Sequence, residues 1–250
     1  SDISVRGVDT DLSPYDTGSY ASSTTYVTGG AVVKTCAALR QMILEEGARL
    51  LGVKAEEAEF DGERVSVPGT DRSVSRAEIG WASFEGHSRY LSACLSHSSP
   101  VSPPPFMAGM AEIDLDPETG KVQVVDYVAV VDCGTVINTN LARVQTEGGI
   151  VQAIGMTLYE DVQYDEAGRM VNDSFLQYKI PTRLEAGSIH VEFAPSYEPT
   201  GPFGAKSIGE LVINTPAPAI AEAVRRATGH MFRSLPIRPE DIALALAEER

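Results

Sequence analysis

Two β-rich segments joined by a tight turn set the strongest constraint on how this chain can fold. Residues 110–115 and 121–131 are rich in apolar and β-branched side chains, and the link between them reads Asp116-Pro117-Glu118-Thr119-Gly120. Proline and glycine in such a link favour chain reversal, so the sequence predicts a β-hairpin. A helix is predicted directly afterwards, over residues 138–158. Its three glycines predict that another segment packs close to its backbone.

The other periodic segments are short strands and separate helices. A first helix is predicted from Thr28 or Gly29 to Gly52, with an apolar face of Val32, Cys36, Leu39, Ile43 and Leu50. Further elements are strands at 3–8, 90–98 and 189–193, hairpins turning at 61–62 and 165–168, and helices at 75–84, 220–227 and from Pro239. This mixture favours an α+β fold, with mixed sheets packed against helices. The proline-rich link at 101–105 allows subdomains 1–100 and 101–250 within one region, 1–250.

Charge and hydropathy exclude two kinds of partner. The 250 residues include 35 acidic and 20 basic side chains, for a formal net charge of −15. A chain this acidic repels phosphate backbones, so no nucleic-acid partner is expected. No apolar run approaches the roughly 20 residues that span a bilayer, so no membrane partner is expected either. The first residues show no basic-then-apolar signal pattern.

The cysteines and histidines do not form a metal-ligand pattern. The three cysteines, Cys36, Cys94 and Cys133, are far apart, and the four histidines form no pair at helical or strand spacing. We therefore expect no metal held by protein side chains. An odd, low cysteine count favours reduced thiols and a cytoplasmic location.

Three stretches rich in glycine and hydroxyl groups have no evident structural purpose. They are residues 15–23, 144–152 and 201–210. Backbone N–H groups in such loops and at helix starts bind anions and heterocycles. Together the three stretches indicate one large polar ligand, held mainly by backbone and neutral side chains.

The third stretch ends on a carboxylate. It reads Gly201-Pro202-Phe203-Gly204-Ala205-Lys206-Ser207-Ile208-Gly209-Glu210, and a helix start follows at Asn214-Thr215-Pro216. A carboxylate held where a glycine-rich loop meets a helix suits a general base. The same pattern also describes a surface turn with a solvated glutamate.

Five segments in order carry a family resemblance that spans nearly the whole chain. They are Asp16-Thr17-Gly18-Ser19-Tyr20-Ala21-Ser22, Asp132-Cys133-Gly134 with Ile137-Asn138, residues 145–155 from Gln145 to Gly155, Tyr178-Lys179-Ile180-Pro181, and Gly204 to Glu210. The chain resembles the C-terminal part of the molybdenum-binding subunit of the xanthine dehydrogenase/aldehyde oxidase family.

The resemblance implies a molybdopterin cofactor with molybdenum, in the cytosine dinucleotide form for a prokaryotic enzyme. In that family the pterin, not the protein, holds the metal. Iron–sulfur and FAD groups belong to partner subunits or domains, and the N-terminal half of the molybdenum subunit forms the other wall of the site. The implied reaction uses water to hydroxylate an electron-poor carbon of an N-heterocycle, purine or nicotinate-like, or of an aldehyde. The isolated chain is expected to be inactive.

The resemblance also implies roles for individual residues. Glu210 corresponds to the catalytic glutamate, the general base. The residues that correspond to cofactor contacts are Gly18, Ser19, Tyr20, Ala21, Ser22, Gln145, Lys206 and Ser207. Lys206 and Ser207 are expected to shape the loop behind Glu210.

Two alternatives keep the same fold. The stretch Asp16-Thr17-Gly18-Ser19-Tyr20 also resembles that of relatives that reductively remove a hydroxyl from an aromatic acyl-CoA thioester. A scaffold or assembly module would keep the fold without catalysis, although a scaffold has no need of Glu210. If another half normally covers this chain, the chain should expose more apolar surface than an ordinary protein.

Overall fold

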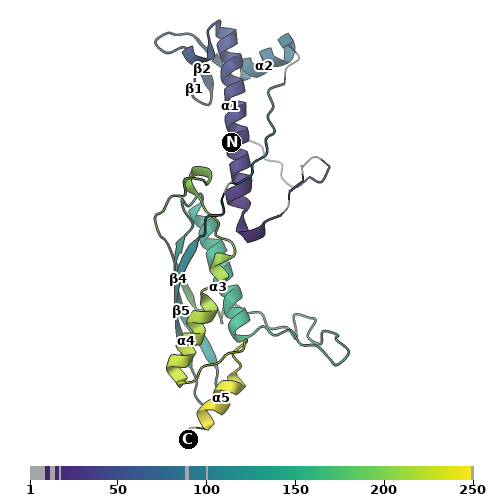
Figure 1. Cartoon of the computed structure of the whole chain (residues 1–250), viewed down its shortest axis with the longest axis vertical. Helices are drawn as coiled ribbons and strands as arrows, with labels where there is room; N and C mark the ends of the chain where they lie inside the picture. Colours follow the sequence, from purple (N-terminus) through teal and green to yellow (C-terminus); the bar gives the residue numbers. More distant parts are fainter. Residues whose placement is uncertain (1–8, 12–14, 17, 88–89, 100, 249–250) are drawn as a thin grey trace. The chain divides into compact units, whose positions relative to one another are not determined.

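The computed structural model describes residues 9–11, 15, 16, 18–87, 90–99 and 101–248, which form two compact units. The larger unit comprises the chain up to Thr24 and from Ser102 onward. The smaller unit, Thr25–Val101, is inserted between these two parts. Both units combine strands with helices, which confirms the predicted α+β class (Figure 1). The strand predicted over residues 3–8 lies outside the described residues.

The smaller unit is built on one long helix and a three-stranded antiparallel sheet. Its elements are α1 (Gly29–Leu51), a 3-10 turn (Ala55–Glu57), β1 (Glu59–Phe60), β2 (Arg64–Ser66), β3 (Ser73–Ser75) and α2 (Arg76–His87). The hairpin predicted at 61–62 is confirmed by the β1–β2 pair. The strand predicted over 90–98 is wrong: this segment has no regular structure and runs close to α1, where Lys34 Nζ donates to Ser96 O at 3.3 Å.

The bounds of α1 are as predicted, but its buried face is not. Gly52 ends the helix in the left-handed conformation, with φ of 66°. Of the predicted apolar face, Val32, Cys36 and Leu50 are exposed. The side that packs on the sheet contains Gly47 and Ala48, and a Cβ at residue 47 would lie 2.6 Å from Val65 side-chain atoms. The small residues are needed because the sheet approaches the helix backbone closely.

The larger unit contains a second three-stranded sheet with helices on one face. Its elements are β4 (Phe106–Leu115), β5 (Val122–Asp132), α3 (Thr139–Leu158), β6 (Ser188–Phe193), α4 (Pro216–Thr228) and α5 (Pro239–Ala247), with short helical turns at Tyr20–Ser22, Pro202–Gly204 and Leu211–Ile213; a π-helical turn at Thr24–Thr28 precedes α1. The predicted hairpin is confirmed as the antiparallel β4–β5 pair. Figure 1 shows α3 and α4 side by side along this sheet.

Strand β5 is the centre of the larger unit's core. Its buried side chains are Val122, Val124, Tyr127, Ala129 and Val131, which pack against α3, α4 and α5. The alternation shifts by one residue at Val125, which is unpaired because Glu112 faces Asp126 and Ile113 faces Val124. This β-bulge keeps both ends of β5 facing the helices. Strand β6 pairs with β5 in parallel, so α3 serves as the crossover between them.

A buried tyrosine links the sheet to the start of α4. The Tyr127 hydroxyl lies 2.9 Å from Thr215 Oγ1, and Gly109 on β4 leaves room for it, since a Cβ there would lie 2.0 Å from the hydroxyl oxygen. Burial raises the pKa of Tyr127, an effect that the Thr215 hydrogen bond opposes. The hydroxyl therefore stays protonated at neutral pH.

Tyr127→Phe should lower the free energy of unfolding by about 1–2 kcal/mol, because it deletes a buried hydrogen bond and leaves Thr215 Oγ1 without its partner. Urea denaturation of the full chain measures this change. Tyr164→Phe is the matched control, since Tyr164 is largely exposed. Equal stabilities of the two variants would show that the Tyr127–Thr215 bond contributes nothing.

Within the described residues, no helix combines the length and apolarity needed to cross a membrane.

Candidate active site

The three polar stretches singled out in the sequence meet at Glu210. Ser22 Oγ accepts a hydrogen bond from the Glu210 backbone N–H at 2.6 Å. Gln145 Nε2 donates to the carbonyl of Gly209 at 3.3 Å. These bonds join residues 188 and 64 positions apart, and all three segments belong to the larger unit. The peptide group that joins Gly209 to Glu210 is thus held from both of its polar atoms, by the first loop and by helix α3.

The first loop has an unusual backbone where it reaches Glu210. Ala21 and Ser22 have φ of 49° and 57°, in the left-handed region that side-chain-bearing residues rarely adopt. Gly18, with φ of 102°, donates its N–H to Asp16 Oδ1 at 2.7 Å. Strained residues of this kind persist when surrounding contacts fix them, and here the Ser22–Glu210 bond is such a contact. Thr17, part of the same motif, lies outside the described residues.

The neighbouring Ser19 hydroxyl is bonded within the loop, whereas the Tyr20 ring is exposed. Ser19 Oγ accepts from Thr24 Oγ1 at 2.6 Å. The Tyr20 side chain is 71% exposed, so it is not part of the core. Both residues lie next to the Ser22 contact, on the same short loop.

Helix α3 presents Gln145 in its second turn. Asn138 caps the helix, since its Oδ1 accepts from the Leu141 N–H at 3.0 Å. The predicted close packing is found at two of the three glycines: a Cβ at Gly149 would lie 2.1 Å from Val212 Cγ2, and one at Gly155 would lie 2.8 Å from Pro181 Cδ. At Gly148 no described atom lies within 4 Å of that position. The turn that follows Glu210 therefore packs directly on the backbone of α3.

The Glu210 carboxylate is exposed and makes no hydrogen bond or ion pair with the described residues. Its backbone is fixed on the other side by the turn Leu211–Ile213, in which Val212 is fully buried. A fixed backbone with an unengaged carboxylate is the arrangement that a general base requires. Ser207, three residues earlier, is half-buried, and its hydroxyl bonds to none of the described residues.

Lys206 is tied to this chain rather than open to solvent. Its Nζ donates to Asp132 Oδ2 at 2.6 Å and to Pro104 O at 3.3 Å, and lies 5.4 Å from the centre of the Phe106 ring. Sequence reasoning assigned no role to Asp132. Its position at the end of a buried strand, directly before Cys133-Gly134, was the available signal.

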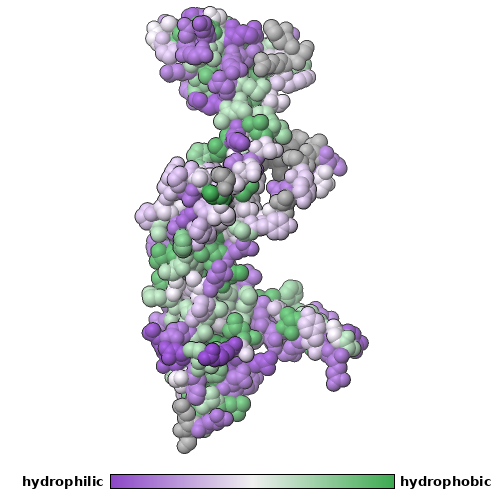
Figure 2. Space-filling model, in the orientation of Figure 1, coloured by the Kyte–Doolittle hydropathy of each residue, from purple (hydrophilic) through white to green (hydrophobic). Residues whose placement is uncertain are grey.

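Exposed apolar side chains surround these loops, as expected for a surface that another segment covers. Figure 2 shows apolar and polar residues interspersed over the visible face of the larger unit. Those on the site loops and the first turns of α3 are Tyr20, Ile137, Leu141, Val144 and Phe203. These side chains lie where the predicted covering half would contact the chain, and the prediction that this surface is more apolar than an ordinary one stays a prediction.

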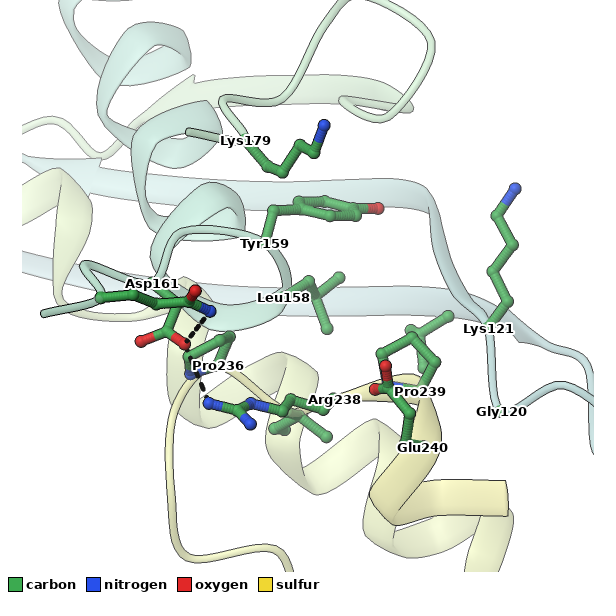
Figure 3. Close-up of a pocket in the computed structure, with 13 residues that line it drawn as sticks. Gly120, Lys121, Leu158, Tyr159, Asp161, Lys179, Pro236, Arg238, Pro239 and Glu240 are labelled. Atoms are coloured by element: carbon green, nitrogen blue, oxygen red, sulfur yellow. Dashed lines mark hydrogen bonds and ion pairs between the residues drawn. The ribbon is translucent and has the colours of Figure 1, made fainter. Parts of the chain in front are cut away.

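A separate pocket lies at the opposite end of α3 and includes none of the predicted site residues. It encloses about 320 Å³ between the end of α3, the turn at Gly120 and the start of α5. Figure 3 shows Arg238 reaching Asp161, with Nη2 2.9 Å from Oδ2, while Lys121 and Lys179 extend along its rim. Because Arg238 and Asp161 pair within it and none of the predicted site residues lines it, this pocket is not taken as the candidate active site.

Among the described residues, no three His, Cys, Asp or Glu side chains gather as metal ligands. The groups that meet at Glu210 are instead backbone amides and carbonyls, a serine hydroxyl and a glutamine amide. Such neutral donors and acceptors suit a polar organic ligand better than a bare cation.

Comparison with known proteins connects this site to a family. Residues 1–186 match the molybdopterin cofactor-binding domain model. The chain is 34% identical over 257 residues to a probable hypoxanthine oxidase of Escherichia coli (strain K12), covering 98% of this chain and 26% of that protein.

Two solved structures share the fold. Quinoline 2-oxidoreductase from Pseudomonas putida 86 superimposes with a TM-score of 0.84 and 28% identity, covering 95% of this chain and 32% of that one. Reconstituted CO dehydrogenase from Oligotropha carboxidovorans gives 0.84 and 25%, over 96% and 31%. The chain spans only 26–32% of the length of these three relatives. By the match over most of its length, this chain belongs to the molybdopterin cofactor-binding domain family of the molybdenum hydroxylases.

Proposed function

We propose that this chain supplies the general base, Glu210, and one wall of the cofactor site in a molybdenum-dependent hydroxylase. The observation that carries the proposal is the meeting of Ser22, Gln145 and Gly209 around a carboxylate that has no partner among the described residues. A scaffold would need the loops to pack but would not need a fixed, unengaged carboxylate.

The residues present fit a molybdopterin group. Backbone groups, hydroxyls and an amide suit the pterin and phosphate parts, and the residues proposed to hold them are Gly18, Ser19, Tyr20, Ala21, Ser22, Gln145 and Ser207, with Lys206 shaping the loop behind Glu210. Neither Gly148 nor the Tyr20 side chain is covered by packing, since a Cβ at Gly148 would meet no described atom within 4 Å and Tyr20 is 71% exposed. When bound, the cofactor supplies the two-electron redox chemistry that these side chains lack.

The part of the reaction that falls to this chain is proton transfer. The Ser22 and Gln145 bonds fix the peptide group before Glu210, and the Leu211–Ile213 turn fixes the backbone after it, so the side chain is anchored at its Cα while its carboxylate is unengaged. It accepts a proton as the substrate carbon is attacked and returns that proton to solvent after turnover. When the covering partner packs on the exposed apolar side chains, it keeps bulk water away from the Glu210 carboxylate, so that water does not compete with the substrate for it.

The proposed substrates are an electron-poor N-heterocycle, purine or nicotinate-like, or an aldehyde, with water as the oxygen source. The heterocycles are supported by two relatives, named as a probable hypoxanthine oxidase and a quinoline 2-oxidoreductase. We further propose the cytosine dinucleotide form of the cofactor, iron–sulfur and FAD groups in partner subunits or domains, an N-terminal partner half, and a cytoplasmic location.

The test uses the complex in which this chain is joined by the rest of its molybdenum subunit. We expect the complex to contain molybdenum and to transfer oxygen from isotope-labelled water to a heterocycle or an aldehyde, as mass spectrometry of the product shows. The chain alone should bind little cofactor and turn over nothing, because the other wall is missing. Loss of a hydroxyl from an aromatic thioester would favour the reductive alternative. A natively purified complex without molybdenum would favour the scaffold.

A further inference from the structure

A nearly buried ion pair lies at the base of the Glu210 loop. The Lys206 side chain is 9% exposed and that of Asp132 is 24% exposed, with Nζ and Oδ2 2.6 Å apart. The other carboxylate oxygen of Asp132 accepts from the Gly134 N–H at 3.1 Å and from the Ser196 hydroxyl. The pair therefore has its hydrogen-bonding capacity filled from several segments, which an exposed surface pair rarely achieves.

The ammonium of Lys206 joins three segments of the larger unit. Besides Asp132 on β5, it donates to the carbonyl of Pro104 and lies over the ring of Phe106, at the start of β4. Both β4 and β5 are long strands of the core sheet. Lys206 is thus anchored to the most rigid part of the unit, four residues before Glu210.

Backbone bonds set the register of the same junction. Lys206 N–H donates to Cys133 O, and Thr135 N–H donates to Gly204 O, both at 2.8 Å. An isolated bridge between Gly134 and Ala205 lies between them. These backbone bonds pair residues 133–135 with residues 204–206. The Asp132–Lys206 side-chain pair then holds the start of the Glu210 loop against the end of β5.

The groups around Asp132 keep its carboxylate ionised, as a permanent ion pair with Lys206 requires. Burial on its own would raise the pKa of Asp132, but the bonds from Lys206, Ser196 and Gly134 lower it below its usual value. The carboxylate therefore stays ionised throughout the pH range in which such an enzyme works. Loss of either partner would leave a poorly solvated charge without its counter-ion.

We infer that Asp132 and Lys206 are positioning residues that hold the Glu210 loop in its productive place, and that Lys206 acts through Asp132 rather than by contact with the cofactor. The inference rests on the proposed role of Glu210. It changes the role expected for Lys206 from a cofactor contact to an anchor, and it gives a role to Asp132, which lies in one of the five family segments but had none.

The inference predicts a particular kinetic signature. Lys206→Met and Asp132→Asn should each lower kcat about tenfold to a hundredfold, because a shift of about 1 Å in a catalytic group has effects of that size. KM should change little, since neither side chain contacts substrate. Lys206→Arg should retain most of the activity, because the guanidinium keeps the charge that Asp132 requires.

A second readout does not depend on activity. Hydrogen–deuterium exchange of the full chain in its complex should show amides of residues 204–210 exchanging about tenfold faster in Lys206→Met and Asp132→Asn, as local opening becomes easier. Amides of β5 should stay protected, which shows that the core remains folded. Arg169→Met is the matched control, since the Arg169–Asp165 pair is similarly short, at 2.9 Å, but exposed and in another loop.

The double variant Asp132→Asn with Lys206→Met tests whether the loss of activity comes from the missing ion pair or from the single charge that each single variant leaves without its counter-ion. If the pair acts as a unit, the double variant should lose no more activity than either single variant. Lys206→Met with reduced molybdenum content and unchanged loop exchange would overturn the inference in favour of a direct cofactor contact. Normal kcat and normal exchange in both single variants, with Glu210→Gln inactive, would overturn the positioning role alone. A fully active Glu210→Gln enzyme would overturn the proposed function itself.

Discussion

Glu210→Gln is expected to reduce kcat of the assembled enzyme by about a hundredfold to ten-thousandfold, the contribution typical of a positioned general base. Glutamine keeps the size and polarity of the side chain, but its amide oxygen does not accept a proton as the Glu210 carboxylate does. Because the carboxylate has no partner among the described residues, its removal should leave the fold unchanged. Steady-state kinetics with molybdenum content measured on the same sample tests this expectation.

Two further variants sharpen the assignment of Glu210. Glu210→Ala opens space at an exposed position, so added formate should restore part of the lost activity if a carboxylate is all that is missing. Glu118→Gln is the matched control, since Glu118 is an exposed carboxylate in the β4–β5 turn. Near-normal turnover by Glu210→Gln with a full complement of molybdenum would refute the base assignment.

Gly134→Ala should be the most damaging single-methyl change near the site. Gly134 has φ of 68°, and a Cβ there would lie 2.3 Å from Gly204 O and 2.9 Å from Lys206 N. These neighbours are backbone atoms, so the added methyl cannot be relieved by a side-chain rotation. Strain in the left-handed region and overpacking together should lower the free energy of unfolding by about 2–5 kcal/mol.

The clash can be separated from the backbone strain. Gly168 has φ of 76°, but no described atom lies within 4 Å of its Cβ position. Gly168→Ala should therefore cost only the strain of the left-handed conformation, about 1–2 kcal/mol. Urea denaturation of both variants measures the difference, and kcat should fall only in Gly134→Ala. If both variants lost the same free energy of unfolding, the close contact of residue 134 with Gly204 and Lys206 would contribute nothing to the stability.

Local sequence patterns predicted most of the elements and the hairpin pairings β1–β2 and β4–β5, but not the pairing of strands far apart in the sequence. The Asp116–Gly120 turn and the caps of α1 and α3 involve near neighbours, so their signals are readable in order along the chain. The parallel pairing of β6 with β5 was not predicted, because it depends on a crossover through α3. The predicted apolar face of α1 was right for Ile43, which packs on the core, but it missed Gly47 and Ala48, which the sheet approaches, because small residues carry little hydrophobic signal.

At the site, too, the local motifs were predicted, whereas a contact between residues far apart in the sequence was not. The loops around Ser22, Gln145 and Glu210 were found from composition and motif, and the structure brings them together. The Asp132–Lys206 pair was not found, because residues 74 positions apart reveal no pairing in a single sequence. The strain at Ala21 and Ser22 was equally invisible, since neither residue type favours that conformation.

The insertion of the smaller unit has a consequence for how the site assembles. All the proposed site residues belong to the larger unit, yet Ser22 precedes residues 25–101 and Glu210 follows them. The hydrogen bond between Ser22 and Glu210 therefore closes a loop that contains the whole inserted unit. The entropy lost on closing that loop depends on how many of its residues are already ordered. A destabilised insertion would thus weaken the Ser22–Glu210 hydrogen bond by raising the entropy cost of closing that loop.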